Sequence, residues 1–166
     1  MTFSNNRVKK RSENQIEKMS SVNQTSYILR FDGSSDGNPG PAGAGALLFA
    51  KDGKVLYRFR EGLGHQTNNA AEFYALILGM KQAIKKGYKN IIAEGDGPLV
   101  INQFQGLWTI CDADIKMLRD EALKLKNSFQ SFRMRHIPES YNTTADSLAN
   151  QAIDLGDGQV EEESLG

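Results

Sequence analysis

The sequence has few of the features that mark secreted or membrane proteins. Its 166 residues include one cysteine, Cys111, so an intramolecular disulfide is impossible. No apolar run approaches the roughly 20 residues of a membrane-spanning helix, and the polar start MTFSNNRVKKRSENQ lacks the apolar segment of a secretory signal. We therefore expect an intracellular protein, cytoplasmic or nuclear, that makes no contact with membranes. Basic residues near the N-terminus leave import into an organelle open.

One motif and one pattern are also missing. The sequence contains no G-x-x-x-x-G-K-[ST] motif, so nothing supports the binding of nucleoside triphosphates. It contains no heptad seam and no obvious exposed apolar run, which predicts a monomer.

The formal net charge of zero hides an uneven distribution of charged residues. Residues 1–25 contain five basic and two acidic side chains, and residues 154–166 contain five acidic and no basic ones. We expect a disordered basic tail over 1–25, one folded domain over 26–155 and a disordered acidic tail over 156–166. A nuclear-import or nucleic-acid patch at residues 7–11 is the alternative interpretation of the basic cluster.

Alternating and helical apolar patterns predict one mixed α/β domain. The expected strands cover about 27–32, 44–50, 54–62, 90–94 and 132–137. The expected helices cover about 68–86, 98 onward, 112–127 and 143–155, with Thr67, Asp112 or Asp114, and Thr143 or Thr144 as candidate N-caps. Because three strands precede the first helix and helices then alternate with strands, we expect a mixed sheet whose helices cover its faces.

Four acidic residues stand where an expected strand or helix meets a turn: Asp32, Glu72, Asp96 and Asp146. Carboxylates gathered at one sheet edge repel one another strongly unless a cation lies between them. An all-oxygen ligand set suits Mg²⁺ or Mn²⁺ better than zinc. Because the chain contains twenty acidic residues, position alone leaves these four as ordinary surface residues, and their sequence neighbours must decide.

Four segments carry a family resemblance. They are FDGSSDGNPGPAGAG at 31–45, TNNAAE at 67–72, EGDGPLVINQ at 94–103 and HIPESYNTTADSLA at 136–149. In this order and on these elements they resemble type 1 of the ribonuclease H family, from about Tyr27 to Ile153. The resemblance implies an α/β, ribonuclease H-like fold with a five-stranded mixed sheet in the order 3-2-1-4-5, flanked by helices.

The resemblance also implies an activity. Members of this type hydrolyse the RNA strand of RNA–DNA hybrids with two Mg²⁺ ions, with Mn²⁺ as the alternative metal, and leave a 5′-phosphate and a 3′-hydroxyl. Their four metal ligands fall on Asp32, Glu72, Asp96 and Asp146 of this chain. His136, ten residues before Asp146, matches the family's loop histidine, which implies assistance in proton transfer or in departure of the product.

Five further residues match the family's contacts to nucleic acid. By resemblance, the amides of Asn38, Asn68 and Asn69 contact the minor groove, where they sense the RNA 2′-hydroxyl. Thr67 is implied to bind a DNA phosphate, and Trp108 to lie against the DNA strand. Taken alone, Asn38 is more typical of a turn and Asn68 and Asn69 of a helix-capping region. Trp108 is as typical of core packing as of a stacking surface.

The chain departs from the family pattern near the substrate. The stretch WTICDADIKM at 108–117 lacks the basic handle of some relatives, so the resemblance is to a compact form with modest affinity. Gly97 and Pro98 stand where many relatives have a Ser and an amide, and Asp36 stands where a basic residue is common. These changes keep open a non-cleaving module that binds hybrids or other nucleic acids. The carboxylates alone would also suit a glycoside hydrolase.

Overall fold

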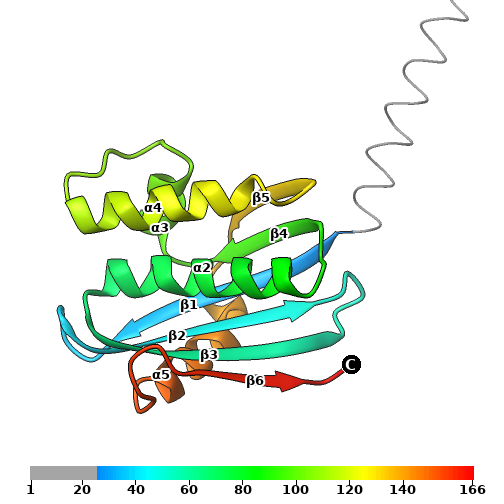
Figure 1. Cartoon of the computed structure of the whole chain (residues 1–166), viewed down its shortest axis with the longest axis horizontal. Coiled ribbons are helices and arrows are strands. Elements are labelled where there is room, and N and C mark those ends of the chain that lie inside the picture. The colour runs from blue at the N-terminus through cyan, green and yellow to red at the C-terminus, as the bar shows by residue number, and fades with distance from the viewer. Residues whose placement is uncertain (1–25) are drawn as a thin grey trace, which may run out of the picture.

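The computed structural model describes residues 26–166, which form a six-stranded sheet with helices on both faces (Figure 1). The predicted basic tail over 1–25 lies outside the described residues. The strands are β1 (Tyr27–Ser35), β2 (Gly40–Phe49), β3 (Val55–Gln66), β4 (Asn90–Gly95), β5 (Ser131–His136) and β6 (Val160–Ser164). The helices are α2 (Asn68–Lys85), α3 (Pro98–Phe104), α4 (Ala113–Lys126) and α5 (Thr143–Ala152), and a 3-10 turn, η1 (Glu139–Tyr141), precedes α5.

The sheet is mixed, in the order β5-β4-β1-β2-β3-β6. β1, β2 and β3 form an antiparallel meander, whereas β4 and β5 run parallel to β1. The meander turns between β2 and β3 at Asp52-Gly53, where a φ of 92° at Gly53 costs a glycine little. The predicted order 3-2-1-4-5 is confirmed, with one strand added beside β3. Because β1 and β4 are parallel neighbours, their carboxyl ends meet at one edge of the sheet.

The helices form a layer on each side of the sheet. α2 packs on one face with α4 beside it, and α5 packs on the other (Figure 1). α2 buries Phe73, Leu76 and Met80 completely, because apolar residues three and four positions apart share one helix face. Thr67 caps α2, as predicted, and its Oγ1 accepts the N–H three residues along at 3.1 Å. Between residues 26 and 166, no helix combines the length and the apolar character that crossing a membrane requires.

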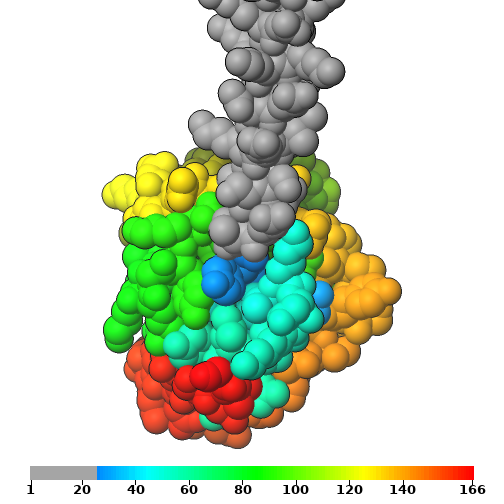
Figure 2. Space-filling model, turned by 90° about the vertical axis from the view of Figure 1, so that its right-hand side faces the viewer, coloured from blue at the N-terminus to red at the C-terminus, as the bar shows by residue number. Residues whose placement is uncertain are grey.

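The C-terminal segment forms a strand that the sequence-based prediction missed. β6 pairs antiparallel with β3, and in Figure 2 the red C-terminal atoms lie beside the cyan β2–β3 region. Three ion pairs join β6 to β3 and to the end of α2: Arg58–Glu163 at 3.3 Å, Arg60–Glu161 at 2.6 Å and Lys86–Glu162 at 2.7 Å. The prediction of a disordered acidic tail over 156–166 is therefore wrong, because its acidic side chains meet basic partners at the edge of the sheet.

Candidate metal centre and nucleic-acid interface

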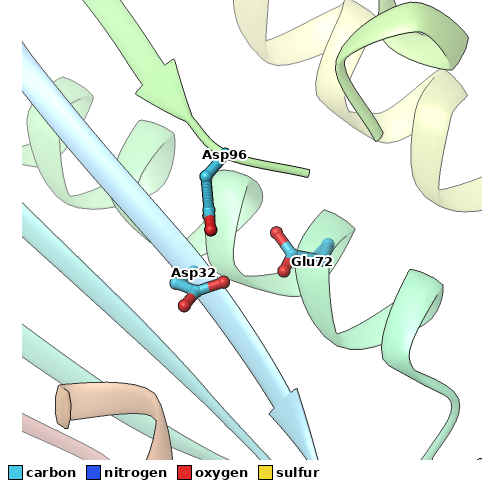
Figure 3. Close-up of side chains that lie close together, drawn as sticks. All are labelled: Asp32, Glu72 and Asp96. Carbon is cyan, nitrogen blue, oxygen red and sulfur yellow. The ribbon is translucent and has the colours of Figure 1, made fainter. Parts of the chain in front are cut away.

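Three carboxylates from three elements meet at the edge of the sheet. Asp32 lies on β1, Glu72 on α2 and Asp96 directly after β4, and their side chains gather in one place (Figure 3). One carboxylate oxygen from each lies within 4.8 Å of the others. The parallel strands β1 and β4 carry Asp32 and Asp96 to the same edge, and the start of α2 adds Glu72.

A glycine allows the strand and the helix to approach closely enough for this contact. A Cβ at Gly33 would lie 2.1 Å from the Ala71 carbonyl carbon and 2.4 Å from the Glu72 nitrogen, so any side chain would push the two elements apart. Without a Cβ, β1 lies directly against the start of α2. Burial raises the pKa of Glu72, and the nearby backbone of Gly33 acts to lower it. The Asp-Gly pair on β1 therefore supplies one acid and the room for the second.

The clustered acids are costly to ionise together. Burial raises the pKa of Asp32, which is 6% exposed, and its hydrogen bond with Glu72 and the charges of Glu72 and Asp96 raise it further. Burial also raises the pKa of Glu72, although the hydrogen bond with Asp32 acts in the opposite direction. The cluster therefore binds a proton or a cation more tightly than separated acids would.

The donor set fits a divalent cation. Oε2 of Glu72 is buried and has no hydrogen-bond partner among residues 26–166, so this oxygen lacks the positive partner that a cation supplies. The other ligand atoms that meet here are also carboxylate oxygens, which Mg²⁺ and Mn²⁺ prefer. A divalent cation would offset both the mutual repulsion and the cost of burial.

Asp146 lies beside this cluster. It is an exposed residue in the first turn of α5 and is not among the three acids whose oxygens meet within 4.8 Å. After burial, which dominates, its hydrogen bond raises the pKa of Asp32 and its charge raises that of Glu72. The four acids named by the sequence pattern thus approach one another from β1, α2, the end of β4 and α5.

Asn142 is a site residue that the sequence analysis missed. It is 1% exposed, and its Nδ2 donates to the carbonyl of Phe31 at 3.0 Å and to Oδ1 of Asp96 at 2.9 Å. The predicted N-cap of the last helix was Thr143 or Thr144, but the observed N-cap is Asn142, which makes no side-chain cap bond. An Asn before a helix indicates a cap, and only the fold shows that this amide is directed at an acid.

Two ion pairs share the buried carboxylate of Glu94 near the acids. Glu94, two residues before Asp96, accepts from Arg30 Nε at 3.0 Å and from the Arg135 guanidinium at 2.6 and 2.8 Å. Arg30 donates in addition to the carbonyl of Tyr141 at 3.0 Å. This network joins β1, β4, β5 and η1 beneath the carboxylate edge. The sequence showed Glu94 only as one charged residue at a strand end.

Four of the five residues predicted to contact nucleic acid gather at the start of α2: Asn38, Thr67, Asn68 and Asn69. Oδ1 of Asn38 accepts the N–H of Asn68 at 3.1 Å, and Oδ1 of Asn68 accepts the N–H of Ser35 at 3.1 Å. Asn69 donates to Oε1 of Gln103 at 3.1 Å. The first two bonds fix the loop before β2 against the start of α2, and the third joins α2 to α3. Glu72 follows Asn68 by one turn of α2.

His136 and Trp108 lie on other elements, away from the start of α2. His136 is the exposed last residue of β5 and lies in register with Gly95, directly before Asp96. Trp108 follows α3 and is 47% exposed. Its backbone N–H donates to the carbonyl of Asn102 at 3.2 Å. Contacts of these two residues with a substrate stay predictions.

Comparison with known sequences finds relatives of the whole described core. The profile of a family described as "Reverse transcriptase-like" matches residues 30–152. The chain is similar to a ribonuclease HI of Halobacterium salinarum, with 40% identity over 124 residues, 75% of this chain and 62% of that protein. The chain thus spans less than two thirds of the length of this relative.

Two solved structures share the architecture. The crystal structure of ribonuclease H1 from the halophilic archaeon Halobacterium salinarum gives a TM-score of 0.76 at 37% identity, over 79% of this chain and 99% of that chain. LC11-RNase H1 in complex with an RNA/DNA hybrid gives a TM-score of 0.73 at 30% identity, over 77% and 96%. These likenesses confirm the predicted α/β fold.

Proposed function

Because the chain belongs to the ribonuclease H family of reverse-transcriptase-like domains, we propose that it is a metal-dependent endonuclease that hydrolyses the RNA strand of RNA–DNA hybrids. The observation that carries the proposal is the meeting of Asp32, Glu72 and Asp96 within 4.8 Å, with Asp146 beside Asp32. The relative that was solved with an RNA/DNA hybrid supports the choice of substrate.

The four acids would hold two divalent cations, Mg²⁺ or alternatively Mn²⁺. Such ions, when bound, activate a water and stabilise the leaving oxygen of a phosphodiester, which yields a 5′-phosphate and a 3′-hydroxyl. After burial, Glu72, Asp96 and Asp146 all raise the pKa of Asp32, so Asp32 would be the acid that helps to hold both ions. Asn142 holds Oδ1 of Asp96 and leaves the second oxygen of that carboxylate for a cation.

The start of α2 is suited to read the RNA strand. Asn68 and Asn69 precede Glu72 by about one turn of α2, and Asn38 accepts the N–H of Asn68. Amides both donate and accept, as recognition of a 2′-hydroxyl requires. Thr67 lies at the positive end of α2, where a helix favours an anion. This end would therefore bind a phosphate of the DNA strand.

His136 and Trp108 have supporting roles in this proposal. His136 is the last residue of β5, the strand beside β4, and is exposed, so it would assist proton transfer or departure of the product. General acid–base assistance is a partial contribution to the rate, so loss of His136 slows turnover without abolishing it. Trp108 offers a half-exposed ring on which the DNA strand would pack.

A non-cleaving module that binds hybrids is the second candidate. Gly97 lies so close to the acids that a Cβ there would be 3.4 Å from Oε2 of Glu72, and it offers no polar side chain to a substrate. Pro98 opens α3 without an amide donor. These two positions weaken contacts to a substrate and leave the acids in place.

The test is incubation of labelled RNA–DNA hybrid with the full chain and Mg²⁺, beside Asp96→Asn and a matched control, Asp120→Asn. Asp120 is an exposed acid on α4. We expect the wild type and Asp120→Asn to cut the RNA strand, and Asp96→Asn to cut nothing. Duplexes of RNA alone or DNA alone stay intact in all three.

Two other outcomes of this experiment would support the two alternative functions. Binding of the hybrid by the wild type without any cutting assigns the non-cleaving module. If the wild type neither binds nor cuts the hybrid but cleaves glycosidic bonds in an oligosaccharide, the protein is a glycoside hydrolase.

A further inference from the structure

A row of paired residues crosses the whole sheet on the face that α5 covers. The strand registers place these residues side by side, from β5 to β6: Arg135, Glu94, Arg30, Leu47, Arg58 and Glu163. Ion pairs join the first three and the last two. Leu47 alone interrupts the charges, and it separates two arginines that lie two strands apart, about 10 Å between backbones.

A pocket of about 300 Å³ opens over this interruption. Arg30 and Arg58 line it together with the apolar Leu47 and Phe49, and residues at the start of α5 line it as well. The Arg30 guanidinium lies 4.8 Å from the centre of the Phe49 ring, which holds it at the rim. None of the four acids of the metal centre lines this pocket.

Two polar atoms around the pocket lack partners among residues 26–166. Nε of Arg58 is buried without an acceptor, and Oδ1 of Asn142 is buried without a donor, although Asn142 is 1% exposed. A buried polar atom without a partner costs about 1–3 kcal/mol, so each indicates a missing group. One atom needs an acceptor and the other needs a donor.

The start of α5 adds further unused donors. The first backbone N–H groups of a helix have no partner within the helix, and Asn142 does not cap them with its side chain. Thr144 and Ala145, in the first turn, line the pocket. The row across the sheet contains three arginines and two glutamates, so it carries one uncompensated positive charge beside the positive end of the helix.

We propose that this pocket binds a phosphomonoester attached to a small ring, of the class of the nucleoside 5′-monophosphates. Arginine forks and helix N-termini both match phosphate oxygens. Leu47, Val55 and Phe49 give the ring an apolar surface, and a hydroxyl or amino group of the ligand satisfies Oδ1 of Asn142. A volume near 300 Å³ lies at the lower end for ligand pockets, so the ligand is small. The site does not depend on the proposed nuclease activity.

The test uses the metal-free full chain in EDTA and adenosine 5′-monophosphate, with inorganic phosphate and adenosine as separate arms. We expect one-to-one binding with a Kd of about 1 mM or tighter, measured by calorimetry. Amide NMR signals of Thr144 and Ala145 shift on binding. Inorganic phosphate binds more weakly at the same place, and adenosine binds more weakly still.

Arg58→Gln and Arg60→Gln provide matched variants. Both arginines lie on β3 and pair with a glutamate of β6, but only Arg58 lines the pocket. We expect Arg58→Gln to weaken binding about tenfold, the effect of removing one charge-assisted bond, and Arg60→Gln to change it less than twofold. Equal weakening in both variants, no binding to the wild type, or shifts confined to the start of α2 overturns the proposal. The NMR shifts test the location even if Arg58→Gln does not fold.

Discussion

At the scale of single residues, the buried acids set how stability depends on pH. The pKa of Asp32 and that of Glu72 are raised in the folded protein, first by burial. A carboxyl whose pKa is raised by folding stabilises the fold while it is protonated. This contribution is lost as the pH rises from the pKa of the carboxyl in the unfolded chain, about 4, through its higher pKa in the folded protein. The metal-free protein therefore loses stability at this cluster as the pH rises, and a bound cation opposes that loss.

We predict that Asp32→Asn abolishes cutting and yet raises the free energy of unfolding of the metal-free protein at about pH 8, by on the order of 1 kcal/mol. Urea unfolding in EDTA measures this. Between about pH 5 and pH 8 the wild type loses more stability than Asp32→Asn, and Mg²⁺ stabilises the wild type more than the variant. Asp120→Asn behaves like the wild type. A variant less stable than the wild type at the higher pH contradicts the account.

Asn142 holds Asp96 in place and supports a second prediction. Asn142→Ala leaves Oδ1 of Asp96 and the carbonyl of Phe31 without their donor, which costs about 1–3 kcal/mol of stability. We expect cutting to need a higher Mg²⁺ concentration, because Asp96 is no longer held toward the other acids. Titration of activity against Mg²⁺ measures this.

The control for this prediction is Asn127→Ala at the exposed C-cap of α4, which should keep the Mg²⁺ dependence of the wild type. A purely structural role for Asn142 would lower the melting temperature of Asn142→Ala with no change in that dependence. The motif HIPESYNTTAD located this residue near the site, but its bond to Asp96 joins positions 46 residues apart, which a local pattern does not show.

At the scale of elements, β6 depends on its ion pairs because it contributes few apolar contacts. Its side chains are largely exposed, and each exposed pair contributes at most about 1 kcal/mol. We predict that replacing Glu161, Glu162 and Glu163 together by Gln lowers the free energy of unfolding by about 1 kcal/mol and makes it less sensitive to salt. Amide hydrogen exchange in β3 becomes faster.

Replacement of Glu139, an exposed acid of η1 outside β6, by Gln is the control. Unchanged exchange in β3 of the triple variant would show that backbone pairing alone holds β6 in place. Thermal melts at low and high salt separate the two contributions.

The predictability of each element follows from the source of its stability. β1, α2 and α4 were found because apolar residues recur with the period of a strand or a helix, and Thr67 and Asp112 cap as their positions indicate. β6 was missed because its sequence VEEES has the charge of a solvated tail. Its partners on β3 and α2 lie far earlier in the chain, and their spatial position depends on the finished sheet.

At the scale of the whole molecule, the site was predictable because four motifs carry it in a fixed order. Their residues come together only through the topology, in which parallel β1 and β4 end at one edge and α2 and α5 begin there. The pocket at Arg30 and Arg58 was not predictable, since these two arginines flank Leu47 of β2 only after the three strands have paired. A cross-strand row has no signature in a linear sequence.

Charge over the whole chain bears on how the proposed substrate, a polyanion, would be held. Residues 26–166 carry 15 basic and 18 acidic side chains, so removal of residues 1–25 changes the net charge from zero to −3. The basic handle is missing at 108–117, where Asp112 and Asp114 stand instead. If the proposed substrate is correct, we therefore expect attraction of the polyanionic hybrid to depend strongly on the five basic residues of the first 25 positions.

We predict that a chain beginning at residue 26 binds the hybrid more weakly at low salt, with a dependence of log Kd on log salt reduced by up to about 4, because each phosphate that a basic side chain neutralises releases about one counterion. The matched control keeps the full length but replaces Arg7, Lys9, Lys10, Arg11 and Lys18 by Gln. Both proteins should lose affinity alike, while the rate at saturating hybrid stays that of the full chain, since the metal ligands are untouched. An unchanged salt dependence in both would mean that the folded domain alone holds the substrate.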